Sequence, residues 1–223
     1  MAARPRQEER RPATMTGNPE WTGDSWGDYP TGNEAGDFSV NIQLARFERA
    51  DFGRLINWID SLEALHEWAG YRFKYPLTEQ QLEAHLEEAD HEHSQRQIFR
   101  AIDADTKLVV GHIELTHIWP YLSARVARLL VGDSSLRDQG IGSEVLRAVL
   151  KYGFESFHFD RIDAGIVIDY QAAIRCHEKC GFRHIGTWPG GYKSGQTNIS
   201  VYWMTLYRSE WEQSLKASAP GTP

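Results

Sequence analysis

The alternation of strand-like and helix-like apolar patterns in the middle of the chain constrains the fold most strongly. Ala124–Gly132 form an extended apolar run, and Arg161–Asp169 alternate apolar and polar side chains as a strand does. A helical pattern follows each run, over about Gly140–Phe154 and Gln171–Cys180. Consecutive strand–helix–strand units favour helices packed on both faces of one mixed sheet, so we expect an α/β fold.

The flanking segments extend this pattern to most of the chain. Strand patterns are found at 38–47, 97–103, 107–119, 183–188 and 197–207, the last two around a glycine-rich loop. Helical patterns occupy 50–59 and the segments that begin near Thr78 and Ser209. Thr78 and Gln81 have the spacing of a capping box, which indicates a helix start.

Both ends of the chain differ from this middle part. Residues 1–38 are rich in Gly, Pro and charged side chains and show no apolar periodicity, so too little surface is available to offset the entropy of ordering. We therefore predict a disordered N-terminal tail at 1–38, one domain at 39–214 and a flexible C-terminal tail at 215–223.

Charge and composition exclude several classes of protein. The formal net charge of -7 argues against a nucleic-acid partner, because phosphate binding requires a basic surface. Two cysteines make no disulfide framework, and no apolar run approaches the roughly 18 residues of a membrane span. The segment His91–His93 has no accompanying ligand pattern, so no metal is expected. These observations predict a cytoplasmic protein without a membrane partner.

A glycine-rich turn precedes the helical pattern at 140–154. Gly140 and Gly142 allow a tight turn, and the first N–H groups of the helix then suit an anion, with the Ser143 hydroxyl nearby. A nucleotide P-loop would require Lys-Ser or Lys-Thr after Gly142, and a dinucleotide fingerprint would require Gly or Ala where Val145 stands. A coenzyme A pyrophosphate loop and an ordinary turn both remain open on these residues alone.

Two segments at matched spacing resemble one known family. Arg137-x-x-Gly140-x-Gly142 resembles the Gln/Arg-x-x-Gly-x-Gly/Ala motif of GCN5-related N-acetyltransferases, and 173–182 (Ala-Ile-Arg-Cys-His-Glu-Lys-Cys-Gly-Phe) is similar to its second signature. The resemblance covers about residues 38–212 and lies nearest the ribosomal-protein, aminoglycoside and polyamine branch. It implies an acyl-CoA N-acyltransferase fold, with a mixed, mostly antiparallel sheet whose central strands splay apart.

The resemblance also implies a set of acetyl-CoA contacts. The main chain of Leu129 and Val131 would hold the pantetheine arm and the acetyl carbonyl. Backbone amides of Arg137, Asp138, Gln139, Gly140, Ile141, Gly142 and Ser143 would hold the pyrophosphate. Tyr170 stands where the family often has Asn, and is predicted to contact the cofactor. His177 stands where the family often has the Tyr that protonates the departing thiolate, so His177 is a replacement acid, a pantetheine contact or a sign of weakened catalysis.

Further candidates come from strand and aromatic patterns. His112 and Glu114 alternate onto one face of the strand at 107–119, where either could serve as a general base, directly or through water. Glu114 could equally pair with an arginine such as Arg125. Trp68, Tyr71, Trp188 and Tyr192 could line an acceptor pocket, since aromatic faces attract cationic amines, although aromatic residues also dominate cores.

The resulting functional hypothesis is an acyltransferase. We predict transfer of an acetyl group from acetyl-CoA to a small primary amine by direct attack in a ternary complex, without a metal. The alternatives are acetylation of a protein N-terminus and a non-catalytic acyl-CoA-binding module. Members of the family often dimerise, which makes a homodimer possible.

Overall fold

The computed structural model describes residues 40–90, 94–194 and 197–218, with the side chains of 192–197 and Ser218 left aside. The predicted tail at 1–38 and the segment His91–His93 lie outside this part of the chain. The described residues form a seven-stranded sheet in the order β1-β2-β3-β4-β5-β7-β6. No helix among them is long and apolar enough to cross a membrane.

The bounds of the elements follow the predicted alternation. The strands are β1 (Ile42–Arg46), β2 (Arg96–Asp103), β3 (Val109–Trp119), β4 (Ser123–Val131), β5 (Arg161–Val167), β6 (Arg183–Ser194) and β7 (Thr197–Tyr207). The helices are α1 (Phe52–Trp58), α2 (Leu62–Ala69), α3 (Glu79–Glu87), α4 (Ile141–Phe157), α5 (Gln171–Lys179) and α6 (Arg208–Ser218). All strand pairs are antiparallel except β4–β5, so the predicted mixed, mostly antiparallel sheet is confirmed.

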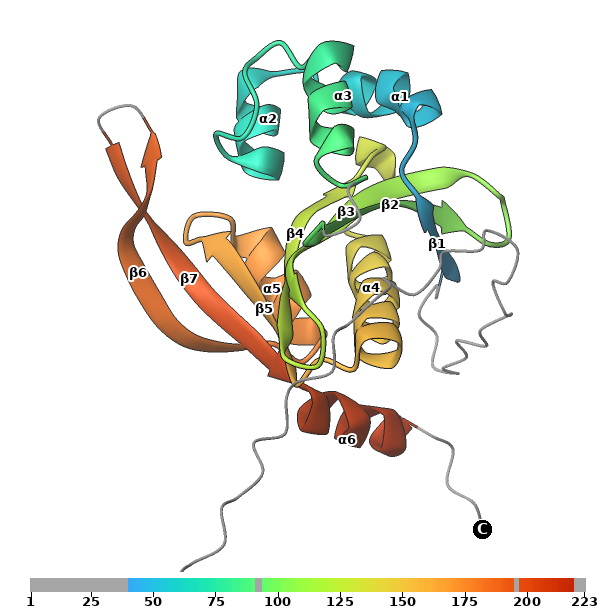
Figure 1. The fold of residues 1–223 in the computed structure, drawn as a ribbon, viewed down its shortest axis with the longest axis vertical. Coiled ribbons are helices and arrows are strands. Elements are labelled where there is room, and N and C mark those ends of the chain that lie inside the picture. The colour runs from blue at the N-terminus through green and yellow to red at the C-terminus, as the bar shows by residue number, and fades with distance from the viewer. Residues whose placement is uncertain (1–39, 91–93, 195–196, 219–223) are drawn as a thin grey trace, which may run out of the picture.

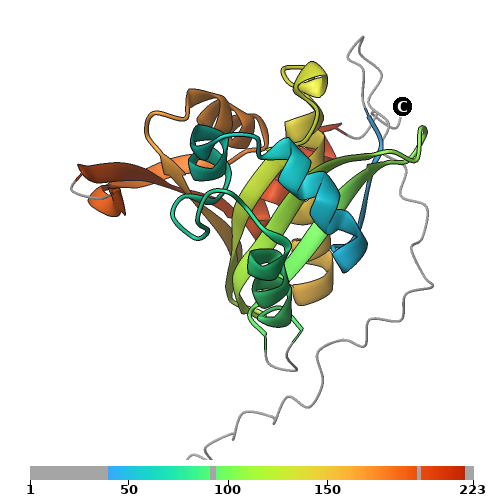
Figure 2. The same cartoon turned by 90° about the horizontal axis from the view of Figure 1, so that it is seen from above.

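Helices cover both faces of the sheet (Figures 1 and 2). The α1–α3 layer lies on one face, over an apolar cluster that includes Leu55, Leu65 and Ile98. The other face packs against α4, whose Val145, Leu146 and Val149 are fully buried. These two clusters bury the apolar faces that the periodicity predicted.

Four local features differ from the sequence prediction. Helix α2 was not predicted, although Ser61 caps it by accepting a hydrogen bond from the Ala64 amide at 3.1 Å. Gln81 does not complete the capping box, because its side-chain amide donates to the Lys74 and Pro76 carbonyls. The glycine-rich segment lies inside β6, at a register shift between Trp188 and Tyr192, and α6 extends to Ser218.

Gly111 marks a close approach between β3 and β4. A Cβ at this position would lie 2.6 Å from the Leu130 carbonyl oxygen, which belongs to the main chain and cannot rotate away. We therefore expect Gly111→Ala to lower the free energy of unfolding by about 1–3 kcal/mol, the usual range for overpacking.

Urea denaturation would measure this effect against Gly53→Ala. A Cβ at Gly53, in α1, would meet no atom within 4 Å. Because alanine favours a helix over glycine by about 0.5–1 kcal/mol, this control should be neutral or stabilising. Equal stability of Gly111→Ala and wild type would contradict the steric argument.

Candidate active site

The strands β4 and β5 pair over only part of their length. Their parallel pairing ends at Val126 and Ala164. Beyond this point β4 remains paired with β3, and β5 with β7. Among the described residues, the predicted cofactor contacts Leu129 and Val131 therefore lie on a stretch of β4 without a partner on the β5 side, which is the splayed arrangement predicted for the central strands.

The N-terminus of α4 follows an exposed turn. Residues 137–140 are exposed, whereas Ile141 and Ser143 are buried. Gly140 has φ +85°, and a Cβ there would meet no atom within 4 Å. The first N–H groups of this 17-residue helix can therefore be approached from solvent. Their partial positive charge suits an anion such as a diphosphate.

The side chains of the turn have different environments. Asp138 is exposed, with φ +60°, and Gln139 donates its side-chain amide to the Ser135 carbonyl at 2.6 Å. The Ser143 hydroxyl lies 3.6 Å from the Cys176 sulfur, and the Ser143 amide donates to the Gly140 carbonyl at 2.9 Å. Ser143 thus has both groups engaged within the protein, which weakens its predicted role. The acetyl-CoA contacts that were predicted for the other residues of this turn stay predictions.

Glu114 lies in a buried ionic cluster on the α1–α3 face of the sheet. Its side chain has no exposed surface. One carboxylate oxygen accepts from Arg96 and Arg128, each at 2.9 Å, while the other accepts from His85 at 2.8 Å and lies 3.4 Å from His112 Nε2. Arg125, the partner suggested by the sequence, instead lies over the Trp203 ring at 4.4 Å.

This cluster does not suit a general base. Burial alone would raise the pKa of Glu114, but the charge of Arg128 and the hydrogen bonds from both histidines outweigh it and hold the pKa well below its usual value. A carboxylate with such a low pKa and four partners has little tendency to take a proton from an amine.

His112 shares this burial. Its ring packs edge-on against Phe47 and Trp68, and its Nδ1 has no hydrogen-bond partner among the described residues. Burial lowers the pKa of His112, so the imidazole is neutral near pH 7. Direct contact with an acceptor would require these aromatic neighbours to move.

His177 is buried on α5 and is not placed as a proton donor. Its Nδ1 lies 2.8 Å from the Ala173 carbonyl oxygen, which can only accept, so Nδ1 carries the proton. Burial lowers the pKa of His177 to about 4. Its ring packs edge-on against Phe182 at 5.1 Å. A neutral imidazole whose proton is already donated does not suit the acid role that the resemblance suggested.

Two predicted residues, Tyr71 and Tyr170, interact electrostatically. Tyr170 is half-buried at the start of α5, and its pKa is raised by burial and by the nearby groups of Glu67, Tyr71 and Asp169. Tyr71 is exposed just after α2, with its ring 4.5 Å from that of His66. The charges of Glu67, at the end of α2, and of Asp169, next to α5 in sequence, therefore act on the Tyr170 hydroxyl.

The other predicted acceptor residues are placed differently. Trp68 is a core residue: it is 5% exposed and stacks on Phe73 at 5.4 Å. Trp188 is 59% exposed on β6, and the side chain of Tyr192 lies outside the described part of the structure. Trp188 and Tyr192 stay predictions.

Sequence reasoning missed His85, Arg96, Arg128, Glu67 and Asp169. The alternation of Arg96 with Ile98 on β2 could have indicated an inward-facing cation, since Ile98 is buried. For His85, Arg128 and Glu67, no pattern in the sequence indicates the interaction, because each partner lies on a different element. Asp169 precedes Tyr170 directly, and its influence could have been inferred from that adjacency.

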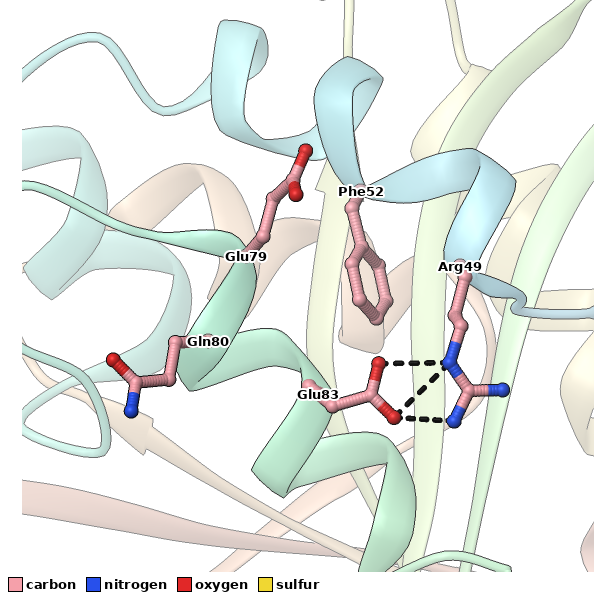
Figure 3. A pocket seen from close by; sticks show the side chains of 5 residues that line it. All are labelled: Arg49, Phe52, Glu79, Gln80 and Glu83. Carbon is pink, nitrogen blue, oxygen red and sulfur yellow. Dashed lines mark hydrogen bonds and ion pairs between the residues drawn. The ribbon is translucent and has the colours of Figure 1, made fainter.

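A separate pocket of about 320 Å³ lies between α3 and the turn that precedes α1. Figure 3 shows its lining residues Arg49, Phe52, Glu79, Gln80 and Glu83. Arg49 and Glu83 form a bidentate ion pair there, with Arg49 Nε 2.8 and 3.0 Å from the two carboxylate oxygens. None of these residues was predicted to be functional. Across the described residues, no group of three or more His, Cys, Asp or Glu is placed to hold a metal ion.

Comparison with known proteins indicates the same family that the sequence motifs resemble. A model of the acetyltransferase (GNAT) domain family matches residues 41–183. The spermidine N-acetyltransferase from Vibrio cholerae, in complex with CoA and spermine, has 19% identity and a TM-score of 0.66, covering 78% of this chain and 99% of that chain. An acetyltransferase of the GNAT family from Bacillus anthracis has 19% identity and a TM-score of 0.64, covering 76% and 96%. An aminoglycoside acetyltransferase in complex with coenzyme A has 16% identity and a TM-score of 0.62, covering 78% and 99%.

Proposed function

Because the chain belongs to the GNAT acetyltransferase family, we propose that it transfers an acetyl group from acetyl-CoA to the primary amine of a small molecule. The observation that carries the proposal is the coincidence of two features. The stretch of β4 after Val126, which among the described strands pairs with β3 alone, supplies main-chain groups, and the open N-terminus of α4 supplies N–H donors for a diphosphate. The exposed Arg137 adds a positive charge to the same turn.

Direct attack by the amine is the chemistry that these residues favour. The amine nitrogen bonds to the thioester carbonyl carbon, the carbon–sulfur bond breaks, the thiolate takes up a proton and the new amide nitrogen loses one. A covalent acyl-enzyme formed on cysteine would need a reactive thiol. Burial raises the pKa of Cys176, and raises that of Cys180 to about 12, so neither cysteine suits this role.

The acceptor is proposed to be a cationic amine. Glu67 and Asp169 both act electrostatically on Tyr170 at the start of α5, and carboxylates with aromatic faces attract a positive charge. Among the similar structures, one is bound to spermine and another is an aminoglycoside acetyltransferase, and both names denote amine-rich molecules.

Calorimetric titration of acetyl-CoA would test the donor site. We expect binding by the wild type and about tenfold weaker binding by Arg137→Glu, because a charge-assisted contact to the diphosphate is lost. Lys216→Glu, on the exposed side of α6, changes the net charge equally and should bind as the wild type does. Failure of the wild type to bind acetyl-CoA would refute the proposed donor.

Thiol release in the presence of different acceptors would test the reaction. The set would include spermidine, an aminoglycoside and a peptide with a free N-terminal amine. Turnover with the small amines supports the proposal, whereas turnover with the peptide alone would favour acetylation of a protein N-terminus.

A second candidate function is a non-catalytic acyl-CoA-binding module. The burial and low pKa of His177 favour it, because the residue at the family's acid position is not available to protonate a thiolate. This candidate predicts acetyl-CoA binding without thiol release for any acceptor.

A further inference from the structure

Arg128 occupies a bulge in β4, directly before the predicted cofactor contacts. His112 pairs with Leu130, but Glu114 pairs with Ala127, so two residues of β4 lie opposite one residue of β3. Arg128 has φ +52°, a left-handed conformation that is costly for a residue with a long side chain. Surrounding contacts must therefore hold the main chain in this shape.

Two contacts from different elements hold Arg128. Its guanidinium donates to Glu114 of β3 at 2.9 Å, and its carbonyl oxygen accepts from the indole N–H of Trp68, in α2, at 3.0 Å. Trp68 lies almost parallel to the Phe73 ring, with an interplanar angle of 3°, and its edge contacts His112. The indole N–H is thus fixed in direction by its packing.

Glu114 is itself held in place by the α3 helix and β2. His85 of α3 and Arg96 of β2 contact its carboxylate at 2.8 and 2.9 Å. The bulge is therefore anchored to the helical layer through Trp68 and to the neighbouring strands through Glu114. All these groups are mostly buried, so bulk water does not compete strongly for them.

We propose that Trp68, Glu114 and Arg128 form a clamp that positions the main chain of Leu129–Val131 for the pantetheine and acetyl part of acetyl-CoA. The proposal rests on the proposed function. It assigns a positioning role to Trp68, Glu114 and Arg128, and none of the three acts as a general base or contacts the acceptor. The anion site at α4 is built from other residues. Loss of the clamp should therefore weaken the binding of the pantetheine and acetyl half of acetyl-CoA and leave the binding of the nucleotide half unchanged.

Trp68→Phe tests the clamp, because it keeps an aromatic ring for stacking and removes the N–H donor, while the buried volume that it also removes is controlled by the second ligand. Titration would compare acetyl-CoA with adenosine 3′,5′-bisphosphate, which carries the nucleotide half without pantetheine. We expect affinity for acetyl-CoA to fall about three- to tenfold, the usual effect of losing one hydrogen bond, with affinity for the bisphosphate unchanged. Trp211→Phe, on α6 and stacked on Phe154 at 4.9 Å, is the matched control and should change neither affinity.

The outcomes separate this clamp from the proposed function. Unchanged affinity for acetyl-CoA in Trp68→Phe, or an equal loss for both ligands, would overturn the clamp. A wild type that binds no acetyl-CoA would overturn the proposed function instead. Arg128→Lys, which keeps the positive charge but lacks the planar fork of arginine, provides a second variant and should show the same selective loss.

Discussion

Glu114→Gln is expected to lower the free energy of unfolding by roughly 3–5 kcal/mol, the usual cost of removing one partner from a buried ion pair. The substitution keeps the shape of the side chain but removes its negative charge. Arg96 and Arg128 would then remain largely buried, with side chains 18% and 13% exposed, next to a neutral amide. Two cations in a poorly solvated site cannot be neutralised by deprotonation, since arginine stays charged.

Chemical denaturation would measure this loss, with Glu83→Gln as the matched control. Glu83 also binds an arginine, Arg49 (Figure 3), but the side chains of this pair are 68% (Arg49) and 33% (Glu83) exposed. Water and salt screen such pairs, so the control should leave the denaturation midpoint almost unchanged. Similar small effects for both variants would show that the Glu114 cluster adds little to stability.

The stability of the folded protein is expected to fall as the pH decreases from about 6.5 to about 4, partly because of His177. Burial holds the pKa of His177 at about 4, whereas the unfolded chain has the ordinary value of 6.5. Below pH 6.5 the unfolded state therefore binds a proton that the folded state does not. At about 1.4 kcal/mol per unit, this single group accounts for about 3 kcal/mol over the interval.

Denaturation at a series of pH values would test this linkage in His177→Asn. Asparagine can still donate to the Ala173 carbonyl but does not titrate. Between pH 4 and 6.5, the free energy of unfolding of the variant should therefore change with pH by about 1.4 kcal/mol per unit less than that of the wild type. His184→Gln replaces a histidine exposed on β6 and should keep the slope of the wild type. A slope in His177→Asn as steep as that of the wild type would assign the acid sensitivity to other groups.

Periodicity predicted the elements whose apolar side chains face one core. Helix α4 and strand β5 were placed within a few residues, because their burial depends on residues adjacent in sequence. Helix α2 was missed because the aromatic residues Trp68 and Tyr71 suggested a binding segment, although Ser61 marks a helix start. The β6 extension was missed because Gly190 and Gly191 suggested a loop, whereas they lie at an irregularity within the strand.

The candidate site was less predictable because its chemistry depends on long-range contacts. The polar face with His112 and Glu114 was identified, but their state depends on His85, Arg96 and Arg128, which come from three other elements. The same limit applies to His177, whose motif position suggested an acid, while the contacts with Ala173 and Phe182 show a neutral core residue. Residue type gave the candidates, and burial decided between their roles.

The short parallel pairing of β4 and β5 has a consequence for cooperativity. It divides the sheet into two antiparallel halves, β1–β4 and β5–β7–β6, whose direct seam is closed over Ser123–Val126 and Arg161–Ala164. Within each half most strands pair with a sequence neighbour, so their pairing closes comparatively short loops. Joining the two halves at this seam therefore carries a separate entropy cost of loop closure. A ligand between β4 and β5 would therefore add its binding free energy where the native sheet has fewest cross-strand bonds, and would couple the two halves into one unfolding unit.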